Sequence, residues 1–222
     1  MAPRFRNRRH AGNELGAAVK QYAGRTDTVV LGLPRGGIPV ASEVARTIGV
    51  PLDVLVVRKL GVAGQKELAM GAIASGGVCI VNDAVVQQLG IPQAELIRTQ
   101  ALEEMVLANR ERTYRGDALA LPVLDAVTIL VDDGIATGST MRAAVRALRQ
   151  RRPARIVVAI PVASIEGSRP EFLEADEVVC LYSPTPFIAV GQHYEDFSSI
   201  SDEEVRALLE RHSPFNLKKS RN

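Results

Sequence analysis

The segment 126–151 constrains the fold more than any other part of the chain. It begins with a strongly apolar stretch, Ala126–Val131, that is typical of a buried strand. Asp132 and Asp133 follow, then small and hydroxyl residues, and then the hydrophobic period of a helix over 140–151. The inward face of that helix is predicted to carry Met141, Ala144, Val145 and Leu148. A buried strand that turns directly into a helix predicts a mostly parallel sheet covered by helices.

The same alternation runs along the rest of the chain. Further apolar strands are predicted at 28–33, 52–57, 78–81, 155–162 and 177–181. Helices are predicted at 13–22, from Pro39 to a cap at Gly49, at 93–114, and after the capping box Ser201–Glu204. These elements predict a single domain over residues 1–222. The segment 61–77 is rich in Gly and Ala with weak periodicity, so we expect a mobile loop there.

Composition agrees with such a fold and excludes several function classes. Hydrophobic residues make up 46% of the chain and aromatic residues only 4%, so the core must consist mainly of aliphatic side chains. A net charge of +2 does not suggest a nucleic-acid-binding protein. Basic residues gather near both ends, and we interpret them as solvated tails. They are Arg4, Arg6, Arg8 and Arg9 at the front, and Lys218, Lys219 and Arg221 at the back.

The sequence gives no sign of secretion or of membrane insertion. Cys79 and Cys180 each lie in an apolar run, and we interpret them as small buried side chains in a reducing compartment. No apolar stretch reaches the roughly 20 residues of a membrane-spanning helix. The basic N-terminal residues are not followed by the apolar segment of a signal peptide. We therefore expect a cytoplasmic protein with no membrane partner.

The turn between Val131 and the following helix has the chemistry of a sugar-phosphate site. A helix N-terminus presents several N–H groups to an anion, Gly138 lets the backbone approach it, and hydroxyl side chains add donors. These hydroxyls belong to Thr137, Ser139 and Thr140. The two acids would repel a phosphate, but they suit sugar hydroxyls or the waters of a Mg²⁺ ion. The alternative is an acidic turn with an ordinary Ser/Thr cap. A Walker loop and a GxGxxG turn are both absent.

The stretch from Ile129 to Met141 resembles the signature of the type I phosphoribosyltransferases, which bind 5-phosphoribosyl 1-pyrophosphate (PRPP). The resemblance extends along most of the chain, to an uncharacterised subgroup sometimes fused to a dienelactone-hydrolase-like domain; Tyr114–Gly116 and Pro186–Phe197 resemble that subgroup. It implies a Rossmann-like α/β fold, in which helices flank a mostly parallel central sheet, with a small hood. The mobile lid would cover about 59–77, and the hood and terminal helix about 182–212. We expect a homodimer.

The resemblance also implies which residues form the site. Asp132 and Asp133 would hold the ribose and, through water, Mg²⁺. The 5-phosphate would lie on Ala136, Thr137, Gly138, Ser139 and Thr140. Pyrophosphate would lie on Arg35, Gly36 and Gly37, often through an unusual peptide conformation, and on Arg58 and Lys59. The acids together with Arg58 and Lys59 form the predicted catalytic set. Without the resemblance, Gly36–Gly37 is equally an ordinary turn, and Arg58 and Lys59 could be solvated.

The implied reaction transfers the phosphoribosyl group from PRPP to a nitrogenous acceptor, with release of pyrophosphate. Enzymes of this family that act on 6-oxopurines usually carry an Asp where this chain has Ala136, so those bases are disfavoured. Tyr182, Phe187 and Tyr194 could stack on an acceptor ring or belong to the core, and His193 is expected to be structural. Alternatives are a non-catalytic regulator that binds PRPP or nucleotides, and a helper module for a fused hydrolase. No Gly-x-Ser-x-Gly elbow of such a hydrolase occurs here. Lys66 and Glu67 are candidate lid contacts.

Overall fold

Five parallel strands form the centre of the molecule. The computed structural model describes residues 4–62 and 65–212. The strand order of the main sheet is β2-β1-β6-β7-β8, and all neighbouring strands are parallel. The strands are β1 (Thr28–Gly32), β2 (Leu52–Val54), β6 (Val127–Val131), β7 (Arg155–Val162) and β8 (Glu177–Tyr182). The predicted α/β architecture with a parallel central sheet is confirmed.

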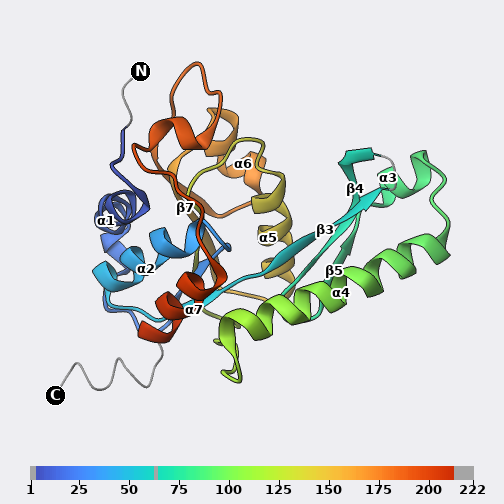
Figure 1. Ribbon diagram of the computed structural model, residues 1–222, viewed down its shortest axis with the longest axis horizontal. Helices are drawn as coiled ribbons and strands as arrows, with labels where there is room; N and C mark the ends of the chain where they lie inside the picture. The colour runs from blue at the N-terminus through green and yellow to red at the C-terminus, as the bar shows by residue number, and fades with distance from the viewer. Residues whose placement is uncertain (1–3, 63–64, 213–222) are drawn as a thin grey trace.

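Helices cover both faces of this sheet (Figure 1). One face carries α1 (Arg8–Ala18), α2 (Gly37–Ile48) and α7 (Asp202–Arg211), and the other carries α5 (Ser139–Gln150) and α6 (Pro170–Leu173). Short 3₁₀ helices lie at Lys20–Tyr22, Glu166–Ser168 and Val190–His193. No helix within the described part of the chain is long and apolar enough to cross a membrane.

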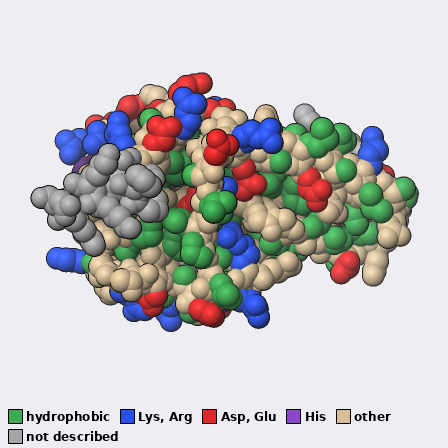
Figure 2. Space-filling model, turned by 90° about the horizontal axis from the view of Figure 1, so that it is seen from below, with side chains coloured by type: hydrophobic (Ala, Val, Ile, Leu, Met, Phe, Trp, Pro, Cys, Tyr) green, Lys and Arg blue, Asp and Glu red, His purple; other side chains and the backbone are tan. Residues whose placement is uncertain are grey.

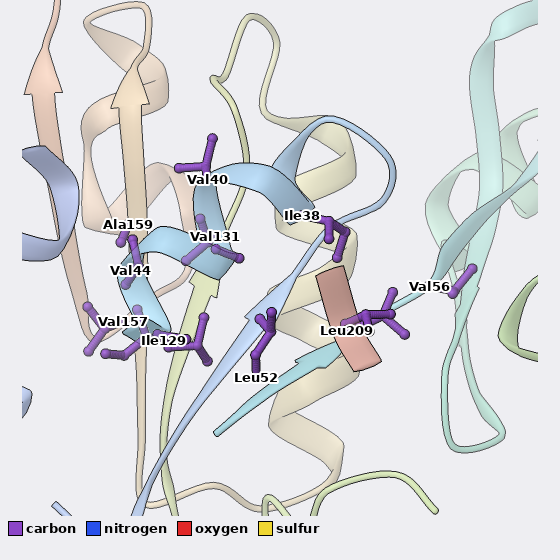
Figure 3. Packing of buried hydrophobic residues seen from close by; sticks show 14 of the residues in the cluster. Ile38, Val40, Val44, Leu52, Val56, Ile129, Val131, Val157, Ala159 and Leu209 are labelled. Carbon is purple, nitrogen blue, oxygen red and sulfur yellow. The ribbon is translucent and has the colours of Figure 1, made fainter. Parts of the chain in front are cut away.

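The side chains of strand β6 pack in two hydrophobic cores, one on each face of the sheet. Successive strand residues point to opposite faces, so Ile129 and Val131 join the core under α2, while Leu130 joins the core under α5. Figure 3 shows Ile129 and Val131 beside Val40 and Val44 of α2. Because β6 is buried on both faces, its end at Asp132 is fixed in position by packing as well as by the strand ladder.

A second, antiparallel sheet projects from the main body (Figure 1). It consists of β3 (Val57–Val62), β4 (Gln65–Ala74) and β5 (Val78–Val81), and it carries α3 (Asp83–Gln88) and α4 (Gln93–Arg115). We call these five elements the arm. The structure therefore corrects the predicted loop at 61–77, most of which is strand. A Cβ at Gly71 would lie 2.3 Å from the Ile80 carbonyl oxygen. At this position the small residue reflects close strand approach rather than an irregular loop.

Element ends differ from the sequence predictions by a few residues. The strand predicted at 52–57 is divided between β2 and β3, and α1 begins five residues before the predicted start at Asn13. The helix predicted to open at Pro39 begins at Gly37, and Gly49 ends it with a left-handed φ of 69°, as predicted. Ser201 caps α7 by accepting a hydrogen bond from the Glu204 N–H, which confirms one half of the capping box.

Candidate functional site

The turn from β6 into α5 leaves the start of the helix open to an anion. Gly138 occupies the N-cap position with φ of 72°, and no side chain caps the first turn. A Cβ at Gly138 would also lie 2.7 Å from Cε1 of Phe172, so both the backbone angle and the space require glycine. Ala136, Thr137, Ser139 and Thr140 around it are exposed. The first N–H groups of α5 therefore remain available to a ligand.

The turn before the helix is held against the end of β7. The Ile135 N–H donates to the Val162 carbonyl at 2.9 Å, and Ser164 Oγ donates to the Ala136 carbonyl at 3.1 Å. A Cβ at Gly134 would come within 2.6 Å of Cγ1 of Val190. These contacts fix the backbone between the acids and residues 136–140, which we call the phosphate turn after its predicted ligand.

Asp132 and Asp133 stand side by side at the carboxyl end of β6. The Asp133 N–H donates to Asp132 Oδ1 at 2.8 Å, and the Tyr194 hydroxyl donates to the Asp133 carbonyl at 2.6 Å. Burial raises the pKa of both carboxyl groups, and the charge of Asp133 raises the pKa of Asp132 further. Two adjacent, partly desolvated carboxyl groups favour a ligand that brings hydroxyl donors or a cation.

Arg8 pairs with one of these acids, which contradicts its interpretation as part of a solvated tail. Only 8% of Arg8 is exposed, and its Nε donates to Asp133 Oδ2 at 2.8 Å. The sequence holds one indication of this position, because Asn is a preferred N-cap residue. In the structure the Asn7 side chain accepts a hydrogen bond from the His10 N–H, and Arg8 is the first residue of α1. That signal locates the helix end but not its partner across the fold.

The glycine loop after β1 packs directly on the acids. A Cβ at Gly36 would lie 2.0 Å from Asp133 Oδ2, and one at Gly37 would lie 2.8 Å from the Val131 carbonyl oxygen. The Pro34–Arg35 peptide bond is cis, so the loop has the unusual peptide that the resemblance implies. The Arg35 side chain is half-exposed, with Nη1 4.0 Å from Asp202 Oδ1. Both glycines are thus required by close packing at the site.

Arg58 and Lys59 point in opposite directions, because they are consecutive residues of a strand. Lys59 Nζ donates to Ser139 Oγ at 2.7 Å, so this lysine contacts the phosphate turn. Arg58 instead pairs with Glu103 of α4, with Nη2 2.6 Å from Oε2. The structure therefore brings only Lys59 of this predicted pair to the turn. The side chains of Lys66 and Glu67 lie outside the described residues.

A pocket of about 270 Å³ lies between the arm and α5. Lys59 and Ser139 form its edge nearest the turn, and Arg142 and Arg146 of α5 line another side. Small and aliphatic residues of the arm, including Ala69 and Ala72, complete it. The pocket adjoins the phosphate turn but does not include the acids.

The aromatic residues predicted near the hood belong to the packing around the site. His193 is buried and stacks on Phe187, with the ring centroids 5.6 Å apart, which confirms its structural role. Tyr194 is buried between Phe5 and Phe197, at centroid distances of 5.5 and 5.1 Å. Arg115 forms ion pairs with Asp53 at 3.0 Å and with Glu111 at 3.2 Å.

Residues 58–195, more than half of the chain, match the family model of the phosphoribosyl transferase domain. The chain therefore belongs to the phosphoribosyl transferase family.

Two relatives match the chain over almost its whole length. Over 207 residues the chain is 43% identical to Rv0571c of Mycobacterium tuberculosis, whose name assigns it provisionally to the phosphoribosyl transferases. The match covers 93% of this chain but 46% of that protein, so this chain spans about half the length of that relative. The crystal structure of TT1426 from Thermus thermophilus is 44% identical with a TM-score of 0.83, and the match covers 94% of this chain and 99% of that one.

Proposed function

We propose that this protein is a phosphoribosyltransferase, which binds PRPP with Mg²⁺ and transfers its phosphoribosyl group to a nitrogenous acceptor. The observation that carries the proposal is a convergence at one edge of the main sheet. Asp132 and Asp133, the loop at Gly36–Gly37 and the open N-terminus of α5 all lie where β1 and β6 end. Ligands of open α/β sheets bind at this edge.

Each part of PRPP finds a complementary group in this arrangement. The 5-phosphate would accept hydrogen bonds from the N–H groups and hydroxyls of 136–140, and the ribose hydroxyls would donate to Asp132 and Asp133. The pyrophosphate would lie between the backbone at 35–37 and Lys59. Arg58 is part of the predicted catalytic set, but its ion pair with Glu103 supports a role in holding the arm.

The two carboxyl groups fit Mg²⁺. This ion prefers oxygen ligands and typically keeps several waters while it binds one or two carboxylates and substrate phosphates. Within the described residues there is no cluster of three or more His, Cys, Asp or Glu side chains, so a dedicated protein cage is not the arrangement proposed. Asp132 and Asp133 would hold the ion through water. When bound, Mg²⁺ would neutralise charge that develops on the leaving pyrophosphate.

In the proposed reaction the bond from C1 to the pyrophosphate oxygen breaks, and the electron pair of the acceptor nitrogen forms a bond to C1. The proton of that nitrogen is released to water. The electron pair of the broken bond leaves with pyrophosphate, whose charge Lys59 and Arg35 would offset. With Mg²⁺ bound, the acids would be ionised and would stabilise positive charge on the ribose ring. Catalysis would rest mainly on positioning these groups.

The acceptor is a nitrogen-containing ring other than a 6-oxopurine, because Ala136 offers no carboxylate to such a base. The aromatic side chains at 187 and 194 are committed to packing, so ring stacking on them is not part of the proposal. A cytoplasmic homodimer without nucleic-acid or membrane partners completes the proposed description.

The test combines binding and turnover with PRPP, Mg²⁺ and a panel of bases and amines. We expect a thermal shift with PRPP and pyrophosphate release with at least one acceptor. The double variant Asp132→Asn/Asp133→Asn should lose the shift. Absence of any PRPP-dependent shift in the unmodified protein would overturn the proposal. Binding without pyrophosphate release on any acceptor would instead support a non-catalytic regulator.

A further inference from the structure

The N-terminal segment reaches the acid pair through a defined path. The Phe5 N–H donates to the His193 carbonyl at 2.9 Å, and the Glu195 N–H donates back to the Phe5 carbonyl at 2.9 Å. This pairing brings the start of α1 beside residue 133. Tyr194, on the paired segment, donates to the Asp133 carbonyl at 2.6 Å. The same local structure thus fixes the backbone of Asp133 and delivers Arg8 to its carboxylate.

Three contacts determine the orientation of the Arg8 guanidinium. Its Nε donates to Asp133 Oδ2 at 2.8 Å, and its Nη1 donates to the Ser198 carbonyl at 2.8 Å. Its Cζ lies 3.8 Å from the centroid of the Phe197 ring, a cation–π distance. Because the group is divided between two acceptors and covered by a ring, it cannot turn freely toward either acid.

We propose that Arg8 is a positioning residue of the PRPP site. It occupies one oxygen of Asp133 and so leaves Oδ1 of this residue, together with Asp132, to face the ligand. Its charge also lets two carboxylates stand next to each other at a partly buried position. The inference rests on the proposed function, and it adds the N-terminal helix to the site. No feature of the signature at 129–141 indicates such a residue.

The test measures PRPP affinity with Mg²⁺ by calorimetry, on variants shown to be folded at the temperature used. We expect Arg8→Met to weaken PRPP binding about 10- to 100-fold, the usual range for a residue that orients a binding carboxylate. Arg8→Lys should restore part of that loss, because it keeps the charge but cannot reach both acceptors. Arg4→Met is the matched control, since Arg4 pairs with Glu14 on the surface.

A milder variant keeps the inference testable if Arg8→Met does not fold. Phe197→Leu removes only the ring above the guanidinium, and we expect it to weaken PRPP binding by about threefold to tenfold. Full PRPP affinity in both Arg8→Met and Phe197→Leu overturns the positioning role while the proposed function stands. Failure of the unmodified protein to bind PRPP overturns both.

An independent observation concerns α4, which has two apolar faces. Leu96, Leu107 and Tyr114 pack inward against the core. Ile97, Leu102 and Met105 are 58%, 56% and 72% exposed on the other side. At 100° per residue these three lie within one half of the helix surface, opposite Leu107. This second face explains why the hydrophobic period of the segment is imperfect.

The outer face of α4 is not covered by any described element. It lies along the lower edge of the arm in Figure 1, and Figure 2, the view from below, shows hydrophobic side chains gathered over that part of the molecule. Val106, which is 39% exposed, adjoins these three side chains.

Discussion

The edge of the main sheet and the arm both contribute residues to the proposed site, but they are built in different ways. At the edge, backbone and side chains are fixed by close packing; even a methyl group at Gly36 would collide with Asp133. Among the described residues of the arm, the exposed side chain of Lys59 reaches the same region. A rigid edge suits recognition of a constant ligand such as a ribose phosphate. A contact made by one flexible cation suits a leaving group such as pyrophosphate, which must be released after the reaction.

The largest expected effect tests the rigid edge. Asp132→Asn should weaken PRPP binding by about 100-fold and should stabilise the ligand-free protein at pH values above the raised pKa of Asp132. Burial raises the pKa of Asp132, so the protein loses stability as pH rises through that raised pKa, and the amide removes this loss. Calorimetric titration and thermal unfolding at pH 5 and 8 check both parts. Equal pH dependence in the variant and the parent would contradict this account; Asp117→Asn, in an exposed loop, is the control.

A smaller effect should separate the two cations of the arm. Lys59→Met is expected to weaken pyrophosphate and PRPP binding by about tenfold, because it removes a charge beside Ser139. Arg58→Met should leave affinity within about twofold and lower the free energy of unfolding by up to about 1 kcal/mol, the scale of a partly exposed ion pair. Affinity and unfolding measurements on both variants check the assignment. An equal loss of PRPP affinity in the Lys59 and Arg58 variants would show that Arg58 also contributes to ligand binding.

A pair of glycine variants sharpens the description of the edge. Gly138→Ala and Gly24→Ala share the cost of a positive φ, 72° and 69°, which is about 1 kcal/mol. Only Gly138 would also meet a neighbour, the Phe172 ring, so its variant should lose more stability and some PRPP affinity. Adding Phe172→Leu should recover part of the difference. Unfolding experiments that show equal losses would mean that space at Gly138 is not limiting.

The smallest expected effect lies behind the edge, where α6 meets α5. Ion pairs with Arg146 and Arg142 lower the pKa of Glu174 to about 2. The associated stability is present above pH 4.5 and is lost as pH falls toward about 2, so Glu174→Gln should remove this acid dependence. Since the pair is solvent-exposed, we expect less than about 1 kcal/mol. Acid titration of unfolding in both proteins measures it.

The edge was largely predictable from sequence, and the arm was not. A strand that enters Asp132 and Asp133 and then turns at Gly138 into a helix is a local pattern, so the strand, turn and helix were predicted together. The arm is held by non-local strand pairing, and its small residues gave no clear period. Gly71 is needed because β5 passes close beside it, which no local pattern at 61–77 indicates.

Arg8 shows the same limit within the site. Its contacts with Asp133 and Ser198 span 125 and 190 residues of the chain, so nothing near Arg8 distinguishes it from Arg6 or Arg9. Likewise, the adjacent cations Arg58 and Lys59 looked equivalent, and only the alternation of β3 directed them to different neighbours.

The sequence by itself determined the parallel fold and the strand–turn–helix segments that carry the proposed donor site, because hydrophobic period, glycine placement and the acids after β6 are encoded within single segments. The tertiary structure alone decided the partners of those groups. Which cation neutralises Asp133, which of two basic residues reaches the phosphate turn, and which face of α4 is left exposed depend on how distant segments pack. Side-chain contacts of that kind follow from the assembled fold, and local pattern does not specify them.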